Sequence, residues 1–178
     1  MASILPSPPI WHNLMVLIAV SRQATSGKHM LRGSTSSLPG FLVQSKILTA
    51  DKLTKRAWPC DPNCPLCDQE PETAAHLYLC CVFAQEVWIL MQGWSNGVVK
   101  TPERGVDIEA WWMSSLQLIP QEQRRHVAAL LMYTTWNIWK ERNRRVFEGK
   151  SMIAPLVFGC ILEELGLRQA ALRAPSVI

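Results

Sequence analysis

The sequence lacks most of the features that an enzyme, a membrane protein or a secreted disulfide scaffold requires. It contains no phosphate-binding glycine loop, no nucleophile elbow and no dinucleotide-binding fingerprint. Its N-terminal apolar run, residues 14–20, is far shorter than the roughly 20 residues that span a bilayer, and prolines precede it in place of a basic segment. We therefore expect no catalytic centre, no small-molecule substrate, no membrane segment and no targeting signal.

Charge is also scarce, because only 18% of the 178 residues are charged and the net charge is +4. A mildly basic chain is compatible with a nucleic-acid partner but does not require one. Hydrophobic residues make up 48%, and the eight tryptophans are a high number for this length. Large aromatic side chains usually lie in a core or an interface, so the composition predicts one domain of ordinary size.

The pattern along the chain divides it into three parts. Prolines and serines in residues 1–40 indicate a poorly ordered N-terminal segment. Residues 41–95 form the predicted metal-binding module, and residues 96–178 a helical C-terminal part packed on it. Apolar spacing predicts helices over residues 83–91, 107–116, 121–147 and 154–172, with few strands. The expected fold class is mainly α, a small helical domain with one zinc-stapled loop-helix unit.

Most of the cysteines lie near one histidine. Cys64 and Cys67 form a C-x2-C pair, and eight residues separate Cys67 from His76, which follows a helix start that Thr73 would cap. A tight turn lets two thiolates converge, and four nitrogen or sulfur ligands describe a closed, structural Zn²⁺ site in a reducing, intracellular compartment. The alternative is a set of unpaired cysteines.

The fourth ligand stays open on the residues alone. Cys80 follows His76 by four positions, so an unbroken helix would put both on one face. Cys81 requires the helix to end or unwind there. Cys60, four positions before Cys64, is a further candidate.

Two blocks of sequence carry a family resemblance. The first comprises LTADKL at residues 48–53, RAWP at 56–59, the C-x2-C pair, His76 and Cys81; the second is WNIWKERNRRVF at 136–147. Together they resemble the zinc-binding region that follows the polymerase in plant non-LTR, LINE-type retrotransposon reverse transcriptases. The resemblance implies bound Zn²⁺, Cys81 as the fourth ligand, and RNA, DNA or neighbouring reverse-transcriptase domains as partners. Because the polymerase's paired aspartates are missing, it implies a non-catalytic fragment of a retroelement polyprotein.

A basic run ends the longest predicted helix, with cations at Lys140, Arg142, Arg144 and Arg145. Cations beside tryptophans favour a nucleic-acid surface, through phosphate contacts and base stacking. The alternative is a solvated helix end, since cations are stabilised near a helix C-terminus. Glu72 would either orient His76 or stabilise a helix start.

The expected function is therefore a structural zinc-binding module that aids template binding. The alternatives are a protein-interaction or purely structural zinc module, or a non-functional retroelement remnant.

Overall fold

The computed structural model describes residues 47–173. The predicted poorly ordered segment, residues 1–40, lies outside the described residues. The elements in chain order are α3 (Ala50–Thr54), the π-helical turn η1 (His76–Cys80), α4 (Val82–Trp94), α5 (Ile108–Gln117), α6 (Gln121–Asn143), the π-helical turn η2 (Arg144–Glu148) and α7 (Ala154–Arg173). No residue between 47 and 173 belongs to a strand, so the mainly α fold class is confirmed.

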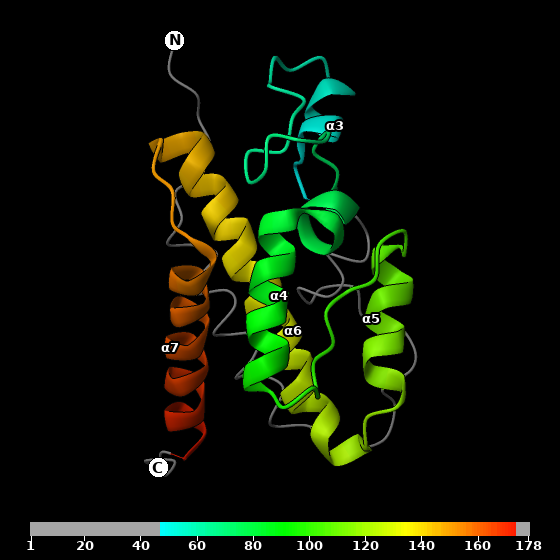
Figure 1. Cartoon of the computed structure of the whole chain (residues 1–178), viewed down its shortest axis with the longest axis vertical. Coiled ribbons are helices and arrows are strands. Elements are labelled where there is room, and N and C mark those ends of the chain that lie inside the picture. The colour runs from blue at the N-terminus through cyan, green and yellow to red at the C-terminus, as the bar shows by residue number, and fades with distance from the viewer. Residues whose placement is uncertain (1–46, 174–178) are drawn as a thin grey trace, which may run out of the picture.

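Three longer helices form the centre of the fold. Figure 1 shows α4 lying across α6, with α7 along one side and α5 on the other. Helix α7 packs against both α4 and α6. The fully buried Trp88 of α4 makes an edge-to-face contact with Trp111 of α5, with ring centroids 5.4 Å apart. Its indole Nε1–H donates to the Tyr78 carbonyl at 2.8 Å, which fixes η1 against α4.

Helix α6 and η2 together cover the long helix predicted over residues 121–147. The apolar stripe of α6 is buried at Val127, Leu131 and Ile138. The same spacing of three or four residues continues to Glu141 and Arg142, which are also buried. The basic end of this helix therefore begins on its inward face.

The segment between α3 and η1 is a long loop that carries the first cysteine pair near its middle. Helix α3 terminates in a Schellman motif, in which the Trp58 amide donates to the Leu53 carbonyl at 3.1 Å and the Ala57 amide to that of Thr54 at 2.9 Å. Ala57 takes the left-handed conformation that this cap requires, with φ 57°. Between residues 55 and 71 only Cys64 and Leu66 are buried, so the loop has almost no apolar core of its own.

None of the helices within residues 47–173 combines the length and apolarity that crossing a bilayer needs.

Candidate metal centre

A closed turn presents the first two cysteines. Asn63 and Pro71 form an isolated antiparallel bridge, and the Cys64 amide donates to the Glu70 carbonyl at 2.8 Å. The Asp68 amide donates to the Cys64 carbonyl at 2.8 Å, and Asp68 itself is left-handed with φ 55°. The loop is therefore pinned at both ends of the C-x2-C pair, and its two thiols lie on the same side.

The third and fourth groups come from the π-helical turn η1. The Thr73 hydroxyl accepts from the His76 amide at 3.0 Å, which confirms Thr73 as the cap of this helix start. The Cys81 amide donates to the His76 carbonyl at 2.7 Å, five residues back. Cys81 then leaves the helix with φ −55° and ψ 130°. The helix thus unwinds at the position where a Cys81 ligand requires it to, and the α-helical geometry that would favour Cys80 is not formed.

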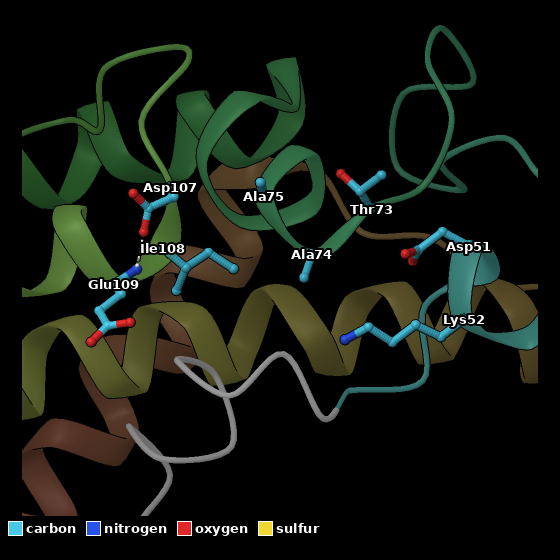
Figure 2. A pocket seen from close by; sticks show the side chains of 8 residues that line it. All are labelled: Asp51, Lys52, Thr73, Ala74, Ala75, Asp107, Ile108 and Glu109. Atoms are coloured by element: carbon cyan, nitrogen blue, oxygen red, sulfur yellow. Dashed lines mark hydrogen bonds between the residues drawn. The ribbon is translucent and has the colours of Figure 1, made fainter. Parts of the chain in front are cut away.

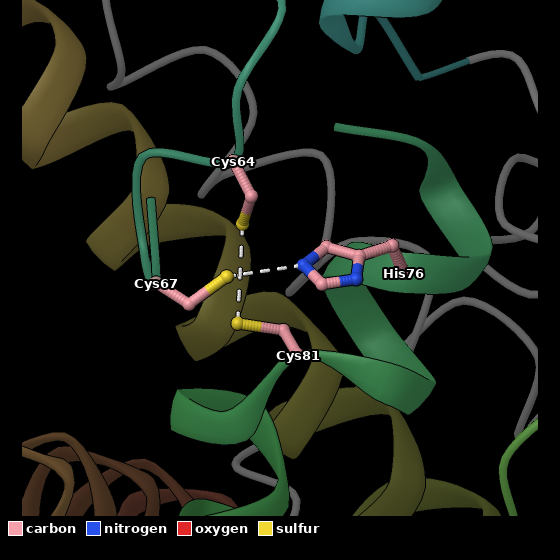
Figure 3. A group of neighbouring side chains, drawn as sticks. All are labelled: Cys64, Cys67, His76 and Cys81. Atoms are coloured by element: carbon pink, nitrogen blue, oxygen red, sulfur yellow. Dashed lines mark hydrogen bonds between the residues drawn. The ribbon is translucent and has the colours of Figure 1, made fainter. Parts of the chain in front are cut away.

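The side chains of Cys64, Cys67, His76 and Cys81 point toward one common centre, as Figure 3 shows. Their ligand atoms all lie within 4.8 Å of one another. The Cys64 and Cys81 sulfurs are 3.9 Å apart, and the Cys67 sulfur is 3.2 Å from His76 Nε2. A tetrahedral zinc site with Zn–S bonds of about 2.3 Å places neighbouring sulfurs about 3.8 Å apart. The observed spacing therefore fits a tetrahedral metal ion with little rearrangement.

The other two candidate ligands are not part of this group. The Cys60 sulfur donates to the Ala50 carbonyl at 3.6 Å and lies 3.6 Å from the Thr54 hydroxyl, so it packs against α3. Cys80 is half-buried beside the apolar core.

Glu70 holds the imidazole from its other side. Its Oε2 lies 3.1 Å from His76 Nδ1, so Nδ1 is engaged and Nε2 faces the cysteines. With a metal ion on Nε2, this carboxylate would fix the ring orientation and raise the basicity of the ligand nitrogen. Of the two roles open to Glu72, the first was to orient His76, and the structure places Glu70 there instead. Glu70 carries no signal for it in the sequence, because the loop conformation alone brings its carboxylate to the ring.

The two buried thiols are electrostatically unequal. The hydrogen bond with Cys81 is the largest reason why the pKa of Cys64 is lowered to about 5, with amides of the turn adding to it. The same hydrogen bond, together with burial, raises the pKa of Cys81. The hydrogen bond between the two sulfurs thus holds a proton on the pair, and a divalent cation would have to displace that proton to gain both sulfurs as ligands.

Glu72 instead forms a buried ion pair with Arg142, and their side chains are 1% and 6% exposed. Arg142 Nε donates to Oε1 at 2.7 Å and Nη2 to Oε2 at 2.8 Å, so the pair is bidentate. Glu72 Oε2 also accepts from the Ala50 amide at 2.8 Å. One carboxylate thus joins the loop that precedes η1 to both α3 and α6.

The structure places all four cations of the basic run beside carboxylates. Lys140 pairs with Glu164 of α7, and Arg142 with Glu72. Arg145 Nε lies 2.8 Å from Glu141 Oε1 and Arg144 Nε 3.8 Å from Glu141 Oε2. The run is thus joined to the interior of the fold. The buried position of Arg142 matches neither a phosphate-binding face nor a freely solvated helix end.

A hollow lies beside the helix start that carries His76. Figure 2 shows its lining side chains, which come from α3, residues 73–75 and the start of α5. Asp107 caps α5 by accepting from the Glu109 and Ala110 amides at 2.9 and 3.0 Å. The lining contains neither cysteine nor histidine, and no nucleophile–base pair converges in it.

Comparison with known proteins points to the same centre. Residues 35–88, which are 54 of the 178, match a family model described as zinc-binding in reverse transcriptase. No curated protein and no solved structure matches the chain. The match contains all four residues of the cluster and supports a reverse-transcriptase zinc-binding domain in this part of the chain. The matched model describes a metal-binding part of a reverse transcriptase, distinct from its catalytic domain.

Proposed function

We propose that this chain is a structural zinc-binding module of a reverse transcriptase of the plant LINE type. The observation that carries the proposal is the cluster of Cys64, Cys67, His76 and Cys81, whose ligand atoms converge within a match to a zinc-binding family. Bound zinc would neutralise the thiolates and lock the four side chains together. The LINE and plant origin rests on the resemblance of the two sequence blocks.

The closed donor set supports a structural rather than a catalytic metal. Four nitrogen or sulfur donors from the protein fill a tetrahedron, which leaves no position for water or substrate. Cys64, His76 and Cys81 are buried, and Cys67 is half-buried. Since residues 55–71 bury only two side chains, metal ligation would replace the apolar core that this loop lacks.

The metal content of the purified full-length chain tests this proposal. We expect one zinc per chain, lost in Cys64→Ser and Cys81→Ser and retained in Cys80→Ser and Cys60→Ser. The last two are matched controls, because they remove a nearby thiol that lies outside the cluster. A folded parent chain without zinc would contradict the proposal, and loss of zinc from Cys80→Ser with retention in Cys81→Ser would exclude the proposed fourth ligand.

Template binding is a second proposed function, and an exposed aromatic side chain favours it. Trp58 is 55% exposed and is the last residue of the Schellman turn, which also carries the exposed Lys55 and Arg56. Exposed cations beside a stacking platform suit a single-stranded nucleic acid. The basic run in α6 and η2 is the other candidate surface, but its cations already face carboxylates.

Salt-dependent binding of single-stranded RNA and DNA by the full-length chain tests this second function. Lys55→Gln with Arg56→Gln should reduce the slope of log affinity against log salt, and Trp58→Ala should weaken binding at every salt concentration. Lys140→Gln is the comparison for the basic run. Absence of binding by the zinc-loaded parent at low salt would leave the purely structural or protein-interacting module as the function.

A further inference from the structure

Arg145 is the member of the basic run whose contacts reach the metal loop. Its Nη1 donates to the carbonyls of Leu66 and Pro65 at 2.9 and 3.3 Å. Its Nε donates to Glu141 at 2.8 Å, and its Nη2 to the Met152 carbonyl at 3.2 Å. Its guanidinium carbon also lies 4.6 Å from the centre of the Phe83 ring. One side chain therefore joins α6, α4 and the connection to α7 to the turn between Cys64 and Cys67.

The two carbonyls that Arg145 binds belong to the peptide units at the centre of that turn. The Cys67 amide, which belongs to the second of these units, donates to the Cys64 carbonyl at 3.3 Å. Neither unit is cis, and in a trans peptide the C=O and the N–H point in opposite directions. Arg145 thus holds the outer edge of the turn whose two ends carry the Cys64 and Cys67 thiols.

We propose that Arg145 is a positioning residue of the metal centre, which fixes the two central peptide units of the Cys64–Cys67 turn and thereby the direction of the two thiols. This inference rests on the proposed zinc-binding function. Groups that hydrogen-bond around the ligands of a metal orient them, and their loss typically weakens metal binding. Here the hydrogen bonds go to the backbone between two ligands, at 2.9 and 3.3 Å, so they restrict the turn that presents both thiols.

The contacts around Arg145 require a guanidinium group, which a lysine cannot replace. Glu141 is 1% exposed in its side chain, and its Oε1 accepts from both Arg145 Nε and the Met152 amide, which lies 2.8 Å away. A planar guanidinium satisfies the carboxylate with one edge and the carbonyls with the other. A lysine would keep the charge near Glu141 but has no second edge to reach the turn.

The experiment compares Arg145→Gln and Arg145→Lys with Arg144→Gln in the full-length chain. Arg144 is the matched control, because the charge change is the same and its side chain contacts Glu141 and Met152 instead of the turn. Zinc affinity is measured by competition with a chelator, and ligand geometry by the absorption spectrum of the Co²⁺-substituted chain. We expect both Arg145 variants to lose about 10-fold or more in zinc affinity and to shift the sulfur-to-cobalt charge-transfer band. Arg144→Gln should change neither.

The other possible outcomes distinguish a failure of this inference from a failure of the proposed function. If the Arg145 variants are less stable but keep the parent's zinc affinity and cobalt spectrum, Arg145 only supports the scaffold and the inference is overturned. Failure of both variants to fold at saturating zinc would overturn it too, because saturating metal offsets a loss confined to the metal site. A parent that binds no zinc would instead refute the proposed function, and the inference would fall with it.

Discussion

Replacing Glu72 by glutamine should lower the free energy of unfolding by about 3–5 kcal/mol, the usual cost of removing one partner of a buried ion pair. The geometry gives a similar figure. Glu72 accepts two charge-assisted hydrogen bonds from Arg142, at 2.7 and 2.8 Å, and such bonds contribute about 1.5–3 kcal/mol each. Neither side chain is more than 6% exposed, so solvent screens this pair little. Glutamine would retain one acceptor oxygen and turn an amide donor toward the guanidinium.

The measurement is urea unfolding at neutral pH with zinc at a fixed saturating concentration, since bound metal itself raises apparent stability. Glu164→Gln is the control. It removes the partner of Lys140, whose side chain is 35% exposed, and should cost no more than about 1 kcal/mol. The double variant Glu72→Gln with Arg142→Met should cost less than the sum of its single changes, because no unpaired charge stays buried. A Glu72→Gln cost no larger than that of Glu164→Gln, or additive single changes, would refute this account of the pair.

Two further predictions concern the metal centre. Glu70→Gln should weaken zinc binding about 10-fold, because the carboxylate at 3.1 Å from His76 Nδ1 orients the ring. Asp68→Asn, a matched charge change in the same loop, should leave the zinc affinity unchanged. Chelator competition measures both affinities, and equal effects of the two changes would contradict the role of Glu70. Zinc binding at pH 7 should release at least one proton, because the hydrogen bond between Cys64 and Cys81 lowers the pKa of the first and raises that of the second, so that one proton stays on the pair. Zinc affinity should therefore rise with pH. Calorimetry in buffers of different ionisation enthalpy counts the released protons, and a binding step without proton release would contradict this prediction.

The helices could be predicted from the sequence because their signals are local. The spacing of apolar residues gave α4, α5, α6 and α7 to within a few positions, and Thr73 caps a helix start as expected. The C-x2-C pair likewise defines a turn by itself. The choice between Cys80 and Cys81 was not local in this sense, because it depends on η1 winding as a π-helical turn. No residue pattern within His76–Cys80 predicts that π-helical winding.

The contacts of the basic run could not be predicted from its composition, since its partners lie about 70 residues away in the chain. Arg142 meets Glu72, and Arg145 meets the carbonyl of Leu66. One signal was available: the helical spacing that buries Val127, Leu131 and Ile138 continues to residues 141, 142 and 145. A cation on the buried stripe of a helix needs a buried anion or a set of carbonyls, so the stripe alone pointed to internal partners.

These partners also bear on how far the zinc-binding unit extends. The family match ends at residue 88, but the loop within it depends on α6 and η2. Glu72, at one end of the metal loop, is neutralised by Arg142, and the turn between the first two cysteines is held from outside by Arg145. A segment limited to the match would retain all four ligands but bury an unpaired carboxylate and free the turn. The second sequence block, residues 136–147, is therefore physically joined to the loop that carries the ligand cluster, and a segment that is to keep this cluster intact has to include it.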